Sequence, residues 1–229
     1  RASATDRGKG HAIAWALEMH DDAAAVALVS GLWRFWQKRG YLVEGRQHVE
    51  RVVATLRPDA PDDLRIAALD ALGGVTYWLG DQSAAQGAYA EALAIRRRQG
   101  DPSQVAEALY NLSFTFLFQD AIDVGAGLLD EAAALMRGQG DEAGLGRVLW
   151  ARANVEWTSG DISRAPAATR YALEALETFE RLGDRFMIAW ATYTAALGSL
   201  VEDDRAETRA RLGTALRAFQ ETGDVSGYT

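Results

Sequence analysis

Apolar side chains recur every three or four residues along most of the chain, which is the period of an α-helix. Leu69, Leu72 and Val75 form one such stripe, and the same spacing returns around Leu109 and Leu112. Each segment runs for about 15 residues before a polar break, which is enough for a helix of about 23 Å. The pattern therefore predicts an all-α protein.

The breaks between these segments return with a step of forty residues, apart from one step of 43. Many of them are a glycine followed by an aspartate, at Gly80, Gly100, Gly140, Gly160, Gly183 and Gly223. Glycine can close a helix in the left-handed conformation, and aspartate can cap the free N–H groups of the next helix. We therefore expect each Gly-Asp pair to form a corner between two helices.

The breaks form two series, each with this step, which alternate along the chain and divide it into an N-terminal helix and five helical hairpins. We expect the helix at 8–20, the hairpins at 21–59, 60–100, 101–140, 141–183 and 184–223, and the start of a truncated repeat at 224–229. Small residues recur where the two helices of a hairpin should come close, and only Trp33 and Val52 of the first hairpin depart from this rule.

The second hairpin reads Leu69-x2-Leu72-Gly73-x2-Thr76 and then Ala85-x3-Tyr89-x2-Ala92. This order resembles the tetratricopeptide repeat, whose usual period is about 34 residues. The longer period here is similar to the long-helix variety of that family. The resemblance implies a right-handed α-α superhelix, a solenoid of five hairpins with one extra N-terminal helix.

A second resemblance lies in residues 11–54 and rests on Leu32-Trp33-Arg34-Phe35-Trp36, Arg39-Gly40-Tyr41 and Glu44-Gly45-Arg46. This run is similar to the C-terminal repeat region of bacterial STAND-type signalling ATPases, LuxR-type transcription regulators and adenylate-cyclase-linked regulators. It implies that the chain is a piece of a longer signalling protein.

Composition narrows the function further. The formal net charge of −8 argues against direct binding to nucleic acid, which needs clustered Lys and Arg. The chain has no cysteine, so we expect a protein of the reducing cytoplasm. No apolar run approaches the length of about 18 residues that a membrane span needs, so we expect that it does not enter a membrane. His11, His20 and His48 are not spaced as metal ligands, and Gly8-Lys9-Gly10 lacks the spacing of a phosphate loop. We therefore expect no enzymatic activity, no metal and no cofactor.

In tetratricopeptide arrays the first helix of each repeat faces the binding groove. The resemblance implies that residues at the equivalent positions of this chain also face a groove. They form an aromatic surface with a polar, basic entrance: Arg34, Lys38, Tyr77, Trp78, Tyr110, Asn111, Phe114, Phe118, Arg147, Trp150, Asn154, Trp157, Trp190 and Tyr193. Aromatic side chains provide large contact areas at interfaces, but rings on helices also pack as ordinary core. The sequence leaves both interpretations open.

Two functions follow from these observations. The first is a non-catalytic sensor and docking domain that binds a protein or peptide segment, or a small apolar ligand, in the aromatic groove. The second is an architectural spacer that binds no ligand and associates with itself, for example as a homodimer through exposed repeat ends.

Overall fold

The computed structural model describes residues 4–117 and 121–222, with side chains described for 10–117 and 121–221. Over these residues the regular secondary structure is entirely helical, and the expected fold of helical hairpins is confirmed. The chain divides into two compact units, Arg1–Asp101 and Pro102–Thr229.

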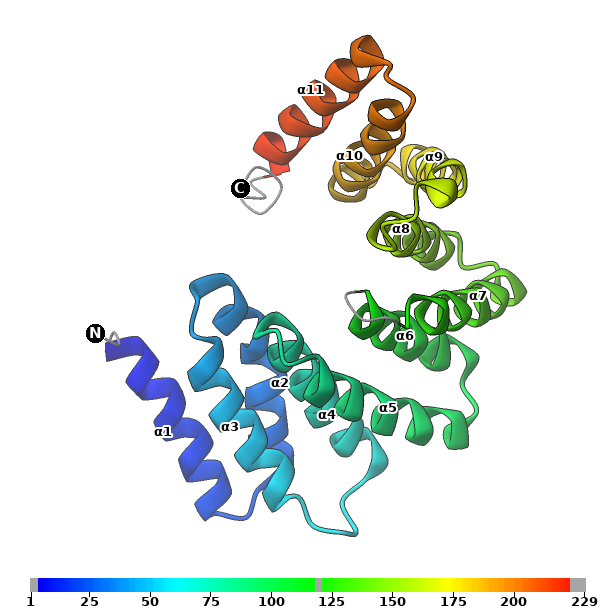
Figure 1. Cartoon of the computed structure of the whole chain (residues 1–229). Coiled ribbons are helices and arrows are strands. Elements are labelled where there is room, and N and C mark those ends of the chain that lie inside the picture. Colours follow the sequence, from blue (N-terminus) through cyan, green and yellow to red (C-terminus); the bar gives the residue numbers. More distant parts are fainter. Residues whose placement is uncertain (1–3, 118–120, 223–229) are drawn as a thin grey trace. The chain divides into compact units, whose positions relative to one another are not determined.

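The first unit consists of α1 (Ala4–Glu18), α2 (Asp22–Arg39), α3 (Leu42–Thr55), α4 (Asp62–Trp78) and α5 (Gln82–Gln99) (Figure 1). α2 packs against α3, α4 packs against α5, and α4 also contacts both helices of the preceding hairpin. α1 begins at Ala4 rather than at residue 8 and packs mainly on α2. The core of the unit gathers Ile13, Val29, Trp36, Val49 and Val75.

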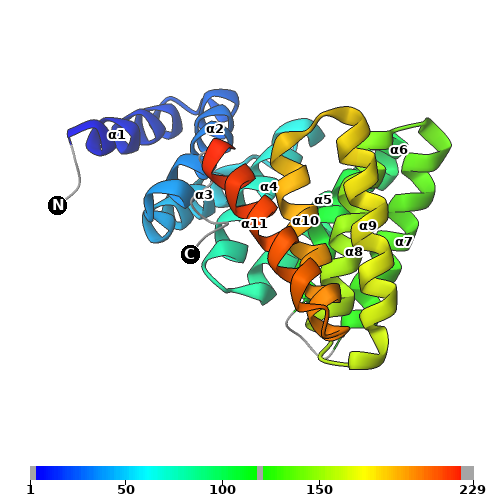
Figure 2. The same cartoon turned by 90° about the horizontal axis from the view of Figure 1, so that it is seen from above.

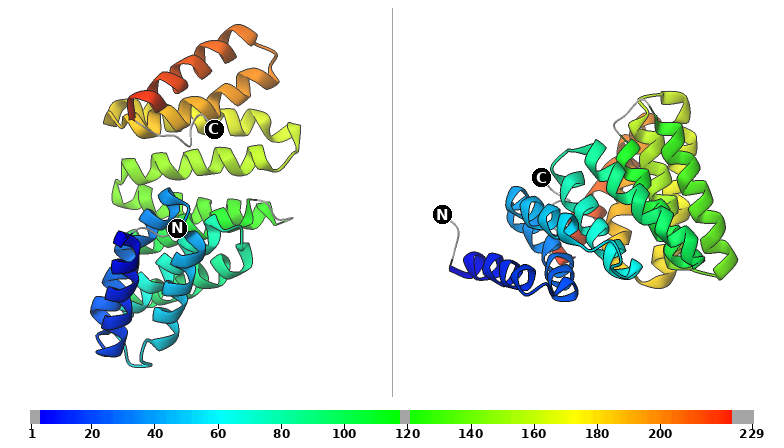
Figure 3. Two further views of the ribbon diagram at one scale, coloured as in Figure 1. Left: turned by 90° about the vertical axis from the view of Figure 1, so that its left-hand side faces the viewer. Right: turned by 90° about the horizontal axis from the view of Figure 1, so that it is seen from below.

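The second unit consists of α6 (Pro102–Ser113), η1 (Phe114–Phe116), α7 (Ile122–Gln139), α8 (Glu142–Thr158), η2 (Ile162–Arg164), α9 (Ala165–Leu182), α10 (Arg185–Val201) and α11 (Arg205–Thr222). Each long helix packs against the next one, and Figures 2 and 3 show α8 to α11 lying side by side. Alternate helices also touch, so that α8 lies between α6 and α10. This arrangement brings the first helices of successive hairpins together along one side of the unit.

The corners between helices have the expected geometry. The glycine at the end of a helix takes a left-handed φ of 68° to 79° at Gly40, Gly100, Gly140 and Gly183. The aspartate that follows a corner accepts a hydrogen bond from the backbone N–H three residues later at Asp21, Asp81, Asp141 and Asp184. His20 and Asp203 stand in phase with the glycines and also have a positive φ, 54° in each case. At these two corners the left-handed backbone is kept although another residue replaces the glycine.

Small residues set how closely the helices of a hairpin approach. A Cβ atom added to Gly73 of α4 would lie only 2.5 Å from the Tyr89 ring of α5. The first hairpin has Trp33 at the corresponding position, and its ring lies against Gly74 of α4, where an added Cβ would be 2.8 Å away. Trp33 therefore packs on the next hairpin, and a second glycine provides the space for it.

The His48 side chain of α3, only 14% exposed, lies at the contact between α1, α2 and α3. Its imidazole stacks on the Trp36 ring, with centroids 5.9 Å apart, and a Cβ atom added to Gly10 of α1 would lie 3.4 Å from it. The Nδ1 atom is buried and has no hydrogen-bond partner among the described residues. Burial lowers the pKa of His48 below its ordinary value of 6.5, and Glu44 only partly opposes this effect.

This burial predicts a pH dependence of the first unit. The unfolded chain binds a proton at His48 near pH 6.5 while the folded chain resists protonation, so stability is complete above about pH 6.5 and falls as the pH drops below it. Urea unfolding followed between about pH 8 and pH 5 should show this loss, and His48→Gln should remove it. An equal pH response of the two proteins would contradict the burial of a neutral imidazole.

Candidate functional site

Six aromatic side chains of the second unit form a continuous series of ring contacts. Centroids of neighbouring rings lie 5.0 to 6.2 Å apart, through Tyr110 of α6, Phe114 of η1, Trp150 of α8, Trp190 and Tyr193 of α10, and Phe219 of α11. Most of these contacts are edge-to-face, an arrangement that adds about 0.5–1.5 kcal/mol per pair beyond the burial of apolar area. We call these six residues the ring series.

The ring series is neither core nor free surface. Tyr110, Phe114, Trp150 and Trp190 are half-buried, and Tyr193 is 39% exposed. Phe219 alone is fully buried, at 1% exposure. The series therefore leaves parts of its rings exposed to solvent over a packed base.

The central ring is held in place by hydrogen bonds. The Trp150 indole Nε1–H donates to Oγ1 of the buried Thr194 at 3.1 Å, and the Thr194 hydroxyl donates to the backbone oxygen of Trp190 at 3.0 Å. The polar atom of Trp150 is thus satisfied inside the protein. Its ring keeps one orientation and can offer only apolar surface to a ligand.

A charged pair lies beside the first ring. The Arg147 guanidinium donates to both carboxylate oxygens of Glu107, at 2.9 and 3.5 Å, and its carbon atom lies 5.5 Å from the centre of the Tyr110 ring. The two side chains are 37% and 40% exposed, so solvent screens the pair and it adds little to stability. Arg147 therefore lies beside the first ring with a carboxylate partner that partly neutralises its charge.

Three further predicted residues of this unit differ in their surroundings. Asn111 and Asn154 are half-buried, and the Asn154 amide donates to the Trp150 backbone oxygen at 2.7 Å, within its own helix. The indole N–H of Trp157 is buried and has no hydrogen-bond partner among the described residues. Phe118 lies outside the described residues.

The predicted residues of the first unit lie on α2 and α4. Arg34 lies over the Trp33 ring, 3.8 Å from its centroid, and Lys38 is exposed one turn later on α2. On α4 the rings of Tyr77 and Trp78 meet edge-to-face at 5.8 Å. Burial raises the pKa of Tyr77, whereas Trp78 is 50% exposed.

Two features of these surfaces were not found by sequence reasoning. Phe219 extends the ring series although it belongs to the second helix of its hairpin, which the resemblance does not assign to the groove. Arg96, in the last turn of α5, is 8% exposed and makes a bidentate ion pair with Asp70, at 2.5 and 3.0 Å. Asp70 and Arg96 lie 26 residues apart in the sequence, and no local pattern of residues predicts their contact.

Neither metal binding nor membrane insertion gains support from the described residues. They contain no cluster of His, Asp and Glu side chains that could hold a metal ion. None of the described helices combines the length and the apolar character that a membrane crossing needs.

Comparison with known proteins relates this architecture to solved structures. BtubC (BKLC) from P. vanneervenii is 19% identical, with a TM-score of 0.74, and the match covers 97% of this chain and 94% of that one. A Rap protein complexed with competence and sporulation factor is 11% identical, with a TM-score of 0.73, and 89% and 55% are covered. A STAND protein with a tetratricopeptide repeat sensor from Pyrococcus horikoshii is 14% identical, with a TM-score of 0.71, and 91% and 32% are covered.

No protein-family model and no curated protein matches the sequence. The chain spans nearly all of BtubC, but only about half of the Rap protein and a third of the STAND protein. At these identities the matches establish the fold alone, which is the tetratricopeptide-like helical repeat.

Proposed function

From the tetratricopeptide-like fold of this chain, we propose that it is a non-catalytic binding domain that recognises a protein or peptide segment through the ring series. The observation that carries the proposal is the ring series itself, which keeps large aromatic side chains half-exposed in fixed contacts. An ordinary core would bury these rings, and an ordinary solvated face would not contain them.

The geometry suits recognition because the rings are already ordered. Immobilising a flexible side chain on binding costs about 0.5–1.5 kcal/mol, and Trp150 avoids this cost because Thr194 already holds its indole. A binding segment would place apolar side chains between Tyr110, Trp150 and Tyr193, whose rings provide the contact area. We assign the Arg147–Glu107 pair to the polar end of this surface, where it can orient the backbone of the segment.

The partner that fits best is therefore a short segment with two or more apolar or aromatic side chains, and a small apolar ligand fits less well. Asn111, next to Tyr110 on α6, is our candidate for holding the backbone of the segment by its amide. By similarity to the Rap complex and to the STAND sensor, we place this function in a larger cytoplasmic signalling protein. Nucleic acid is not expected as a ligand, because the net charge of the chain is −8.

The proposal can be tested with an exposed member of the ring series. Tyr193→Ala removes a ring that is 39% exposed, and we expect it to weaken peptide binding about tenfold, as loss of an interface aromatic typically does. The measurement is the binding of the fluorescently labelled chain to an array of random peptides, with affinities then determined for the strongest peptides.

The matched control is Leu173→Ala on α9, a side chain that is 38% exposed and lies outside the ring series. Binding that is weakened equally by both substitutions would place the site elsewhere. If no peptide binds the unaltered chain, the ring series has no peptide ligand and the role of an architectural spacer becomes the better hypothesis.

A further inference from the structure

The net charge of the chain lies entirely in the second unit. Residues 102–229 contain 11 Arg and no Lys against 19 Asp and Glu, a formal charge of −8. Residues 1–101 contain 13 basic and 13 acidic residues and are neutral. A strong excess of one charge attracts ligands of the opposite charge and speeds their association. The unit that carries the ring series therefore favours a positively charged ligand.

Aromatic rings of this unit already bind guanidinium groups of the chain itself. The guanidinium carbon of Arg147 lies 5.5 Å from the centroid of the Tyr110 ring. On α9, the guanidinium carbons of Arg152 and Arg170 lie 5.4 and 5.1 Å from the centroid of the Tyr171 ring. A ring face attracts a cation at such distances because the face of the π-system is negative. Arginine over tyrosine is thus a recurrent contact in this unit.

Tyr193 of the ring series is a tyrosine without such a cation. No arginine or lysine among the described residues lies over its ring, which is 39% exposed. The ring meets that of Trp190 at 85°, with centroids 6.2 Å apart. Because the two rings are close and nearly perpendicular, a guanidinium placed on Tyr193 also comes near Trp190. These two rings therefore suit an arginine side chain of the partner segment.

A carboxylate lies at the other end of the ring series. Glu107 of α6 accepts hydrogen bonds from Arg147, and an ionised carboxylate has about four acceptor positions, so this pair leaves acceptor capacity. The Glu107 side chain is 40% exposed, and solvent screens its attraction to Arg147. A second basic side chain of the segment can therefore pair with Glu107 at this end.

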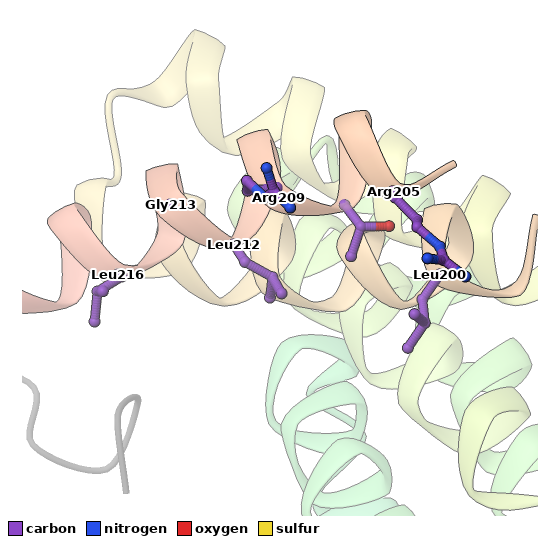
Figure 4. Close-up of a pocket in the computed structure, with 7 residues that line it drawn as sticks. Leu200, Arg205, Arg209, Leu212, Gly213 and Leu216 are labelled. Carbon is purple, nitrogen blue, oxygen red and sulfur yellow. The ribbon is translucent and has the colours of Figure 1, made fainter. Parts of the chain in front are cut away.

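Charge also distinguishes the ring series from another exposed apolar surface of the unit. Figure 4 shows a hollow of about 480 Å³ beside α11, whose lining includes three leucines and two arginines, Leu200, Leu212, Leu216, Arg205 and Arg209. The positive charge of the two arginines disfavours a basic segment in this hollow. A basic segment is therefore directed to the ring series.

We propose that the segment recognised by the ring series is basic, with an arginine that stacks on Tyr193 and Trp190 and a second cation that pairs with Glu107. The apolar side chains of the segment then lie between its two cations, over Phe114 and Trp150. This inference rests on the proposed function, because it specifies the chemistry of the partner for the same site.

The test uses the whole chain and an array of random nine-residue peptides. Ring contacts connect Tyr110 to Tyr193 in four steps of 5.0 to 6.2 Å, a path that about seven residues of extended chain cover. The peptides are acetylated and amidated, so that only their side chains carry charge. The strongest binders are then made with citrulline, which has the shape of arginine without its charge, or with Lys in place of each Arg. Fluorescence anisotropy gives their affinities at low and high salt.

We expect the strongest binders to be enriched in Arg and depleted in Asp and Glu. Replacement of two arginines by citrulline should weaken binding about tenfold, from two cation contacts of ordinary strength. Lys keeps the charge but lacks the planar group that stacks on a ring, so its peptides should bind about threefold more weakly than the arginine peptides.

The contribution of the ring can be separated from that of the charge. Tyr193→Leu keeps an apolar side chain but removes the ring, so it should remove most of the preference for Arg over Lys. Tyr41→Leu is the matched control, because Tyr41 is 37% exposed and lies in the first unit, outside the ring series. This variant should keep the preference, and circular dichroism verifies that both variants are folded.

A further variant predicts a gain of affinity. Arg147→Gln removes the cation that competes for Glu107, so it should strengthen the binding of arginine peptides about threefold. Misfolding of the variant would not produce such a gain. Unchanged or weaker binding of the arginine peptides by this variant would contradict the pairing of a ligand cation with Glu107.

The outcomes separate this proposal from the proposed function. Binders without enrichment in Arg, or citrulline peptides that bind as tightly as the arginine peptides, would overturn the basic partner and leave the peptide site intact. Equal affinities for Arg and Lys peptides that disappear at high salt would indicate unspecific attraction to the acidic unit and would also overturn it. Absence of any binder would overturn the proposed function itself.

Discussion

Trp36→Ala is expected to destabilise the first unit by about 3–5 kcal/mol, the usual cost of removing a fully buried large aromatic side chain. Trp36 is 2% exposed, its ring stacks on His48, and a Cβ atom added to Gly45 of α3 would lie 2.7 Å from it. The loss is a large part of the about 5–15 kcal/mol that holds a typical domain folded. The measurement is native-state hydrogen exchange, read separately for the amides of α1 to α5 and of α6 to α11.

Trp78→Ala provides the matched control in the same unit. Its side chain is 50% exposed, and we expect a loss of no more than about 1 kcal/mol. If both tryptophans cost the same, α2 and α3 do not enclose Trp36 as described. Faster exchange that extends through α6 to α11 would show that the two compact units unfold together.

Glu156→Gln is expected to destabilise the second unit by about 2–3 kcal/mol. The Glu156 side chain is 7% exposed, and its two oxygens accept hydrogen bonds from Arg152 of the same helix and from Arg164 of η2. Breaking a buried ion pair commonly costs about 3–5 kcal/mol. The lower value is expected here because Arg152 keeps Asp130 and Arg164 keeps Asp123 as partners, both on α7.

Urea unfolding of this variant should be compared with that of Glu174→Gln. Glu174 pairs with Arg170 across one turn of α9, and both side chains are at least 50% exposed, so its loss should cost less than about 0.5 kcal/mol. Equal midpoints for the two variants would mean that the cluster around Glu156 contributes no more than a surface pair. A double substitution of Glu156 and Arg164 that costs less than the sum of the single ones would demonstrate their coupling.

The helices and their corners were predictable because both depend on local physics. An apolar period of 3.6 residues buries one face of a helix, and a left-handed glycine such as Gly140 followed by Asp141 ends one helix and starts the next. Because the same signals recur every forty residues, the helix assignment in each hairpin supports the assignment in the others. It also placed His20 and Asp203 at corners, where the structure has the same left-handed backbone.

The predicted site stays a prediction, although the structure brings several of its residues together. The positions carried over from the tetratricopeptide resemblance placed Tyr110, Trp150 and Trp190 on one surface, and these rings do lie in one series. Phe219 was missed because it reaches the series from the neighbouring helix. Whether the ring series and Asn111 bind a partner stays a prediction, to be tested with Tyr193→Ala.

The sequence by itself determined the all-α repeat fold and most of the corners between helices, since these follow from the spacing of residues close together in the chain. Only the tertiary structure decided which side chains from different helices meet. It paired Trp33 with Gly74 and Arg96 with Asp70, and it joined Phe219 to the ring series. Such contacts depend on the distance and rotation between helices, which the packing of the whole unit sets and no local pattern encodes.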